Sequence, residues 1–202
     1  MRIISGEAKG RTLFAPSGLD TRPTSDKLRG SLFNILSARV AGARVLDLFG
    51  GTGALALEAL SRGAAFAVIA DNARQAVQVI ERNARNVLKE DYDHRVRVVR
   101  ADYRSAIAAL TGAPFDLVFL DPPYRMADAY GDALGRLSAA GMLAEDCTAV
   151  LERRRDAAVP IPEEFECIDT REYGETAVDF VRRRQGSQHI QTTDECRASR
   201  LD

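Results

Sequence analysis

The sequence predicts an α/β fold: a seven-stranded, mostly parallel sheet with helices on both faces, a C-terminal antiparallel hairpin, and an N-terminal extension of a β-hairpin and a helix. Apolar runs alternate with helix-like segments through the middle of the chain. A glycine-rich stretch joins one run to a helix. Near the end, runs 165–173 and 176–182 are joined by Gly174-Glu175, and so short a link requires an antiparallel pair.

The N-terminal extension comes first along the chain. Residues 2–5 and 11–14 are extended candidates around a turn, and a loop marked by Pro and Gly follows over 16–23. Thr24 or Ser25 can cap a helix to about Ser37. The apolar stripe of this helix, which we expect to pack in the core, is Leu28, Leu32, Ile35 and Leu36.

Acidic residues recur at the ends of the predicted parallel strands. The predicted strands are 44–49, 64–70, 96–100, 115–120 and 148–152, with helices at 54–62 and 126–139. The acids at the first four strand ends are Asp47, Asp71, Asp102 and Asp121. In an open parallel sheet these ends share one crevice, where ligands bind. Any one of these acids could instead cap the next helix or turn, which is the commoner role of Asp there.

The glycine loop Gly50-Gly51-Thr52-Gly53 lies between the first of these strands and a helix. Glycines let the backbone approach a ligand closely, although the same pattern also forms ordinary tight turns. A nicotinamide dinucleotide and S-adenosylmethionine both fit. Asp47 suits the cationic groups of S-adenosylmethionine, and hydride transfer would lack a proton donor because His94 and His189 lie in a polar loop and the tail. The expected cofactor residues are Asp47, Phe49, Gly50, Gly51, Thr52, Gly53, Asp71, Asn72, Ala101 and Asp102.

The segment Asp121-Pro122-Pro123-Tyr124 follows a buried strand and predicts a seat for a flat base with an exocyclic amine. Its prolines donate no hydrogen bond and hold the turn, so carbonyl oxygens there can accept from a ligand. We expect Asp121 and Pro122 to accept the two amine hydrogens and Tyr124 to stack on the ring. An ordinary strand-ending turn is the alternative. We assign Asp121, Pro122, Pro123 and Tyr124 as the catalytic segment.

Basic residues concentrate at the start of the chain. Residues 1–44 carry eight basic and three acidic groups, a net charge of +5, whereas the whole chain carries −1. A basic arm on an acidic body is typical of nucleic-acid binding, although a solvated surface of uneven charge is the simpler alternative. The residues expected to contact nucleic acid are Arg2, Lys9, Arg11, Arg22, Thr24, Lys27 and Arg29.

These motifs together resemble one family. The chain is similar, from about residue 2 to 182, to bacterial small-subunit (16S) ribosomal RNA guanine-N2 methyltransferases of the RsmD type. The segments that carry the resemblance are Arg2-Ile3-Ile4-Ser5-Gly6 with Gly10-Arg11, Thr21-Arg22-Pro23-Thr24, Arg29-x-x-Leu32-Phe33-Asn34-Ile35-Leu36, Val45-Leu46-Asp47-Leu48-Phe49-Gly50-Gly51-Thr52-Gly53, Asp121-Pro122-Pro123-Tyr124 and Tyr173-Gly174. Two residues depart from the family pattern: Asp71 replaces the usual Glu, and Gly50 replaces a small residue such as Ala.

The resemblance implies a class I methyltransferase, Rossmann-like fold, S-adenosylmethionine as cofactor, and methylation of guanine N2 in ribosomal RNA, free or within the small subunit. A DNA adenine-N6 methyltransferase shares the amine seat and is the nearest alternative. A non-catalytic RNA-binding assembly factor is a third alternative. It is disfavoured because the glycine loop and the amine seat are both intact. We expect residues 1–40 to contact RNA, 41–182 to form the methyltransferase domain, and 183–202 to be a flexible polar tail.

Several expectations are negative. The cysteines, Cys147, Cys167 and Cys196, are far apart without metal-ligand spacing, so we expect free thiols and no metal site. No apolar run reaches membrane-spanning length and no secretory start is seen, which predicts a cytoplasmic protein without membrane contact. We also expect a monomer.

Overall fold

The computed structural model describes residues 1–15 and 26–184. The predicted loop over 16–23, the candidate cap residues Thr24 and Ser25, and most of the predicted tail, residues 185–202, lie outside the described residues. In the described part of the chain, no helix has both the length and the hydrophobicity needed to cross a membrane.

The sheet has seven strands in the order β3-β2-β1-β4-β5-β7-β6. The strands are β1 (Arg44–Asp47), β2 (Phe66–Asp71), β3 (Val96–Arg100), β4 (Phe115–Leu120), β5 (Leu143–Arg154), β6 (Phe165–Tyr173) and β7 (Thr176–Arg183). The pairings among the first five strands are parallel, and β7 pairs antiparallel with both β5 and β6. The predicted α/β fold with a C-terminal antiparallel hairpin is confirmed. Gly174, at φ +64°, provides the left-handed residue of the hairpin turn.

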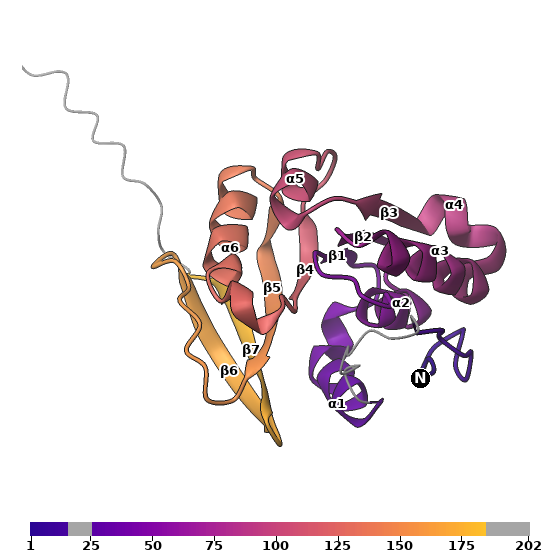
Figure 1. Ribbon diagram of the computed structural model, residues 1–202, viewed down its shortest axis with the longest axis horizontal. Helices are drawn as coiled ribbons and strands as arrows, with labels where there is room; N and C mark the ends of the chain where they lie inside the picture. The colour runs from indigo at the N-terminus through magenta and orange to yellow at the C-terminus, as the bar shows by residue number, and fades with distance from the viewer. Residues whose placement is uncertain (16–25, 185–202) are drawn as a thin grey trace, which may run out of the picture.

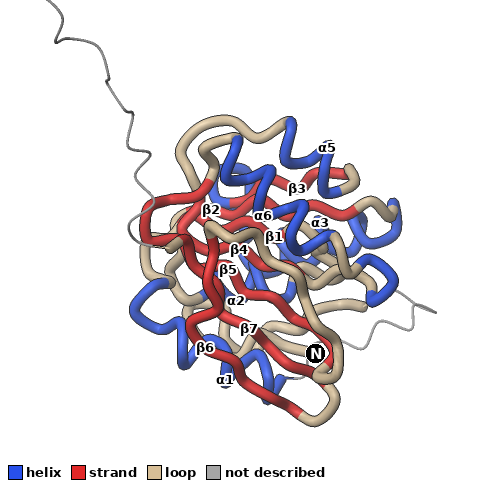
Figure 2. Tube along the Cα trace, turned by 90° about the vertical axis from the view of Figure 1, so that its left-hand side faces the viewer, coloured by secondary structure: helices blue, strands red, loops and turns tan. Residues whose placement is uncertain are grey.

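Helices cover both faces of this sheet (Figure 1, Figure 2). The helices are α1 (Asp26–Leu36), α2 (Ala54–Ser61), α3 (Arg74–Leu88), α4 (Tyr92–Arg95), α5 (Tyr103–Ala108) and α6 (Ala129–Ala139). Buried residues of α1, α2 and α3 form one hydrophobic cluster against the sheet, while those of α5 and α6 form the cluster on the opposite face. All residues of α2 are buried, because the N-terminal arm packs on the side of this helix that faces away from the sheet.

The N-terminal arm, residues 1–15, is less regular than the predicted hairpin. A single antiparallel bridge joins Arg2 to Thr12, and no longer strand pairing forms in the arm. Its apolar side chains explain this, because Ile3, Ala8 and Leu13 are buried in the same cluster as α1 and α2. The arm therefore follows the surface of the domain instead of forming an independent ribbon.

Other boundaries lie within two residues of the prediction, except the starts of β5 and α6. β5 begins at Leu143, well before the expected residue 148. Its first half carries exposed acids and is shifted in register against β4, so the apolar pattern of the sequence did not indicate it. α6 begins at Ala129, three residues later than expected, because residues Tyr124–Met126 form a short 3-10 helix. This short helix follows the Asp-Pro-Pro-Tyr segment directly and so fixes where Tyr124 lies.

Candidate active site

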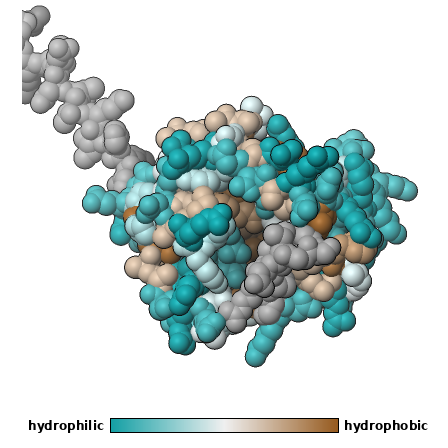
Figure 3. All heavy atoms as spheres, in the orientation of Figure 1, coloured by the Kyte–Doolittle hydropathy of each residue, from teal (hydrophilic) through white to brown (hydrophobic). Residues whose placement is uncertain are grey.

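The acids at the strand ends gather where the order of the sheet reverses. β1 and β4 are neighbours, and the chain proceeds outward from them to β2 on one side and to β5 on the other. Asp47 of β1 is in register with Phe119 of β4. Asp121 follows Phe119 by two residues along the chain, so the two acids lie near each other at the ends of neighbouring strands. Such a switch point is where open α/β sheets bind ligands. Figure 3 shows a hollow near the middle of the face seen in Figure 1, with hydrophobic atoms at its floor and hydrophilic side chains around it.

The glycine loop is tied to the end of β2 by Asp71. Asp71 accepts hydrogen bonds from the backbone N–H groups of Gly51 and Ala73, both at 2.9 Å. Gly53 has φ +76° and precedes α2, where a left-handed conformation favours glycine. Asp71 therefore stabilises the conformation of the glycine loop, and it also lies where the hydroxyls of a ribose are expected.

Packing explains why position 50 is a glycine in this chain. A Cβ on Gly50 would lie 2.5 Å from Ile69 Cγ2 and 2.9 Å from Ile80 Cδ1. Both distances are shorter than real Cβ contacts, so an alanine would require both isoleucines to move. The departure from the family pattern at this position thus follows from the bulk of the side chains beneath the loop.

Asp47 is a buried carboxyl group with no cationic partner within residues 1–15 and 26–184. It is 3% exposed and accepts a hydrogen bond from Phe49 N–H at 3.3 Å. Burial, together with the negative charge of Asp71, raises its pKa to about 7 against the opposing effect of hydrogen bonds from the backbone. The charge of Asp47 also raises the pKa of Asp121, which follows β4, the strand next to β1. A ligand carrying positive charge would relieve their mutual repulsion, which fits the sulfonium and ammonium groups of S-adenosylmethionine.

In the Asp-Pro-Pro-Tyr segment, the aspartate is more buried than the tyrosine. Asp121 is half-buried, and burial followed by the charges of Glu152 and Asp47 raises its pKa well above the ordinary value. The carbonyl of Pro123 accepts from Met126 N–H at 2.8 Å, so this carbonyl is engaged and Pro122 supplies the other candidate acceptor. Tyr124 is 59% exposed, with the Arg154 guanidinium 6.0 Å from its ring centroid.

Glu152 is a site residue that the sequence reasoning missed. Leu120 of β4 is in register with Leu151 of β5, so Asp121 and Glu152 come next on neighbouring parallel strands. Their charges interact, as the raised pKa of Asp121 shows. The Tyr130 hydroxyl donates to the Glu152 backbone carbonyl at 2.6 Å, which ties α6 to this strand end. The available signal was that Glu152 continues the pattern of acids at strand ends.

The remaining expected cofactor residues lie at the same edge. Ala101 N–H donates to the Asp71 carbonyl at 3.1 Å, and the Phe49 ring lies 5.6 Å from that of Tyr103. Asn72 is exposed beside Asp71. Asp102 caps α5, accepting from Arg104 N–H, Ser105 N–H and the Ser105 hydroxyl at 2.7 to 3.1 Å, and these bonds lower its pKa. The Asp102 side chain thus has the capping role that sequence reasoning kept as the alternative.

The expected RNA-contacting residues divide into four groups, of which the buried Arg29 is the last. Arg2, Lys9 and Lys27 are exposed. Arg11 donates to the backbone carbonyls of Asn86 and Val87 at 2.8 and 2.6 Å, so its guanidinium holds the arm against α3. Arg22 and Thr24 lie outside the described residues.

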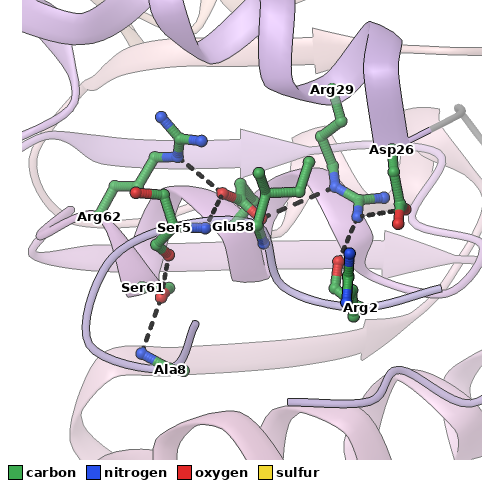
Figure 4. Close-up of polar contacts among 9 residues, drawn as sticks. Arg2, Ser5, Ala8, Asp26, Arg29, Glu58, Ser61 and Arg62 are labelled. Atoms are coloured by element: carbon green, nitrogen blue, oxygen red, sulfur yellow. Dashed lines mark hydrogen bonds and ion pairs between the residues drawn. The ribbon is translucent and has the colours of Figure 1, made fainter. Parts of the chain in front are cut away.

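The prediction that Arg29 contacts RNA is wrong, because Arg29 is fully buried. Its guanidinium lies between Asp26 at 3.0 Å and Glu58 at 3.7 Å, and it also donates to the Arg2 carbonyl (Figure 4). An RNA phosphate cannot reach it there. Sequence showed the charge of this residue but not its depth.

Glu58 is the centre of the polar cluster that attaches the arm to α2 (Figure 4). Its carboxylate accepts from Ile4 N–H and Ser5 N–H at 2.8 and 3.0 Å and pairs with Arg62 at 2.7 Å. The Ser61 hydroxyl donates to the Ser5 carbonyl and accepts from Ala8 N–H. A single acid within the apolar run of α2 was the sequence signal for such a buried partner.

Comparisons with known proteins identify the family of this chain. A family model described as "Conserved hypothetical protein 95" matches residues 1–182. "Putative rRNA methyltransferase YlbH" of Bacillus subtilis is 37% identical over 189 residues, which cover 91% of this chain and all of that protein. "Ribosomal RNA small subunit methyltransferase D" of Escherichia coli K12 is 34% identical, with 79% of this chain and 78% of that protein covered.

Solved structures give the same result. The structure of "Putative methyltransferase yhhF from Escherichia coli" superposes with a TM-score of 0.77 at 32% identity, covering 91% of this chain and 97% of the other. The class I methyltransferase fold is established in this way, and S-adenosylmethionine is the cofactor. The chain belongs to the conserved hypothetical protein 95 family, the RsmD family of methyltransferases.

Proposed function

We propose that this protein transfers a methyl group from S-adenosylmethionine to the exocyclic N2 of a guanine in small-subunit ribosomal RNA. The observation that carries the proposal is the pair of neighbouring acids Asp121 and Glu152 beside the cofactor acid Asp47. The names of the relatives from Escherichia coli and Bacillus subtilis, which specify ribosomal RNA, support the substrate class.

The glycine loop and the acids of β1 and β2 would hold the cofactor. Asp47 offers a buried negative charge to the cationic end of the molecule, and Asp71 offers carboxylate oxygens to the ribose hydroxyls. When bound, S-adenosylmethionine supplies a methyl group on a positively charged sulfur, which departs as a neutral thioether once the carbon–sulfur bond breaks and the carbon–nitrogen bond forms.

The Asp-Pro-Pro-Tyr segment would position the base. The Asp121 carboxylate and the Pro122 carbonyl accept the two N2 hydrogens, which orients the nitrogen lone pair out of the ring plane, and the exposed ring of Tyr124 stacks on the purine. Methylated N2 carries an extra proton until it is neutralised. Asp121 accepts this proton, because its raised pKa makes it a stronger base than an exposed aspartate.

Glu152 supports guanine over adenine as the target. The Watson–Crick edge of guanine has two adjacent donor groups, N1–H and the N2 amine, whereas adenine has an acceptor at N1. Two neighbouring carboxylates can receive both donors of guanine, while an acceptor facing Glu152 would be repelled. The acid pair therefore favours a guanine amine over the adenine amine that is the substrate of DNA enzymes with a similar seat.

The N-terminal extension would contact the RNA backbone. Arg2, Lys9 and Lys27 are exposed on it, and Arg22 and Thr24 are assigned with them from sequence. Neutralising Lys9 and Lys27 together should reduce the salt dependence of RNA binding by about two counterions, since each phosphate contact releases about one. An unchanged slope would reject the extension as the element that grips RNA.

The proposal is tested by substrate competition. The protein is incubated with methyl-labelled cofactor and with naked small-subunit ribosomal RNA, assembled small subunits or double-stranded DNA, and labelled nucleosides are identified by mass spectrometry. The proposal predicts N2-methylguanosine from one of the ribosomal substrates. Label recovered as N6-methyladenine in DNA would refute it, and so would RNA binding with no transfer to any substrate.

A further inference from the structure

Asn83 joins the cofactor loop to the N-terminal arm. It lies in α3, is fully buried, and donates from Nδ2 to two backbone carbonyls, those of Thr52 and Phe14, both at 2.9 Å. Its Oδ1 accepts from Phe14 N–H at 2.8 Å. Thr52 belongs to the glycine loop, and Phe14 lies near the end of the N-terminal arm, two residues before Pro16.

The amide geometry makes these contacts interdependent. A carboxamide is planar, so its two N–H directions and its oxygen cannot be aimed separately. A shift of the Thr52 carbonyl that reorients the Asn83 amide must therefore also disturb both hydrogen bonds to Phe14. Buried polar networks of this kind have few alternative arrangements, because an unmatched group is costly away from water.

Neighbouring contacts hold both ends of this connection in place. On the loop side, the side chain of Ile80, one turn before Asn83, lies against Gly50 and Gly53, where an added Cβ would be 2.9 and 3.4 Å from it. On the arm side, the Arg82 guanidinium lies 3.4 Å from the centroid of the Phe14 ring. α3 thus contacts the cofactor loop and the arm through residues of a single turn, 80–83.

We propose that Asn83 is a positioning residue that couples occupancy of the cofactor loop to the conformation of the N-terminal arm. Binding of the cofactor stabilises one position of the Thr52 carbonyl, and Asn83 transmits that position to Phe14 in the arm. By linkage, RNA held by the arm strengthens cofactor binding by the same factor. The RNA part of this statement rests on the proposed function, whereas the coupling between loop and arm does not.

Asn86 provides a matched control. It lies on the next turn of α3 and donates to the Thr12 carbonyl at 3.0 Å, so it holds the arm, and its contacts in the described chain are with the arm and not the glycine loop. Asn86→Ala loosens the arm without cutting the connection to Thr52. Asn83→Ser removes the amide that reaches both elements and keeps a small polar group at the buried position.

The first test uses hydrogen exchange without RNA. Adding S-adenosylhomocysteine to the wild-type protein should slow exchange of the Leu13 and Phe14 amides about fivefold or more, the lower end of ordinary coupling between sites. Unchanged exchange in the arm at saturating S-adenosylhomocysteine would overturn the proposal. This measurement needs no variant, so it remains decisive if Asn83→Ser fails to fold.

The second test measures the coupling itself. The Kd for small-subunit ribosomal RNA is determined with and without S-adenosylhomocysteine for wild type, Asn83→Ser and Asn86→Ala. The proposal predicts about fivefold tighter RNA binding with the ligand in wild type and Asn86→Ala, and a ratio near one in Asn83→Ser. A ratio retained in Asn83→Ser, or lost equally in Asn86→Ala, would overturn it. Absence of RNA binding in wild type would instead reject the proposed substrate, leaving hydrogen exchange to decide the coupling.

Discussion

The buried carboxyl of Asp47 should make the stability of the cofactor-free protein fall as the pH rises. Its pKa is raised from 3.8 to about 7, chiefly by burial, which corresponds to ~4 kcal/mol at about 1.4 kcal/mol per pKa unit. The unfolded chain loses this proton near pH 4, whereas the folded chain retains it until about pH 7. The free energy of unfolding therefore decreases between these pH values and levels off above the folded pKa.

Replacing Asp47 with Asn isolates this contribution, because the side chain keeps its shape but cannot ionise. Urea denaturation of both cofactor-free proteins at pH 5, 6, 7 and 8 gives the difference in unfolding free energy. We expect Asp47→Asn to gain about 3 kcal/mol relative to wild type between pH 5 and pH 8, because about two of the pKa units of the shift lie within this range. The raised pKa of Asp121 contributes in both proteins and largely cancels.

Cofactor affinity should show the opposite trend. The ionised Asp47 attracts a cation, so calorimetry should find S-adenosylmethionine binding to wild type about tenfold tighter at pH 8 than at pH 6, since the ionised fraction rises about tenfold around a pKa of about 7. Asp47→Asn should bind more weakly with little dependence on pH. A stability difference that stays constant from pH 5 to 8 would refute the reasoning for Asp47.

Three further substitutions test the loop, the arm and the base seat. Asp71→Ala removes the acceptor of Gly51 N–H as well as the ribose contact, so calorimetry should show cofactor binding weakened by about 1–3 kcal/mol; unchanged affinity would exclude this role. Gly6→Ala should lower the unfolding free energy by more than about 1 kcal/mol relative to Gly10→Ala. Both glycines have positive φ, but only at Gly6 would the Cβ lie 1.8 Å from the Ser61 carbonyl oxygen. Equal melting temperatures of the two variants would contradict the packing of the arm against α2. Glu152→Gln should reduce kcat/KM on the RNA about 10-fold or more with cofactor affinity retained, whereas Glu145→Gln, at an exposed position of the same strand, should match wild type; equal effects would remove Glu152 from the seat.

The sheet could be predicted because its signals are local. The expected bounds of β3, β4 and β6 match the structure, since each is a compact extended run bounded by charged residues, Pro or Gly. The acids that follow such runs could be placed at one edge from topology alone. β5 was predicted too short because Glu145 and Asp146 interrupt its apolar pattern while its backbone continues in the ladder.

The polar interior could not be predicted in the same way, because it depends on partners far apart in sequence. Glu58 is paired with the arm backbone 54 residues away, and Asn83 with Phe14 at a separation of 69. Periodicity identifies the apolar face of a helix, but it does not reveal which polar residue meets a distant carbonyl. Arg29 shows the same limit, since its charge predicted a surface role and its burial next to Glu58 gives it a structural one.

The most direct test is the separation of cofactor binding from methyl transfer in Asp121→Asn. If the amine seat and the cofactor loop share one edge of the sheet but use different acids, calorimetry should give a cofactor Kd within about threefold of wild type, while single-turnover transfer to small-subunit ribosomal RNA falls by about 100-fold or more. Transfer at the wild-type rate, or loss of cofactor binding together with transfer, would contradict this account.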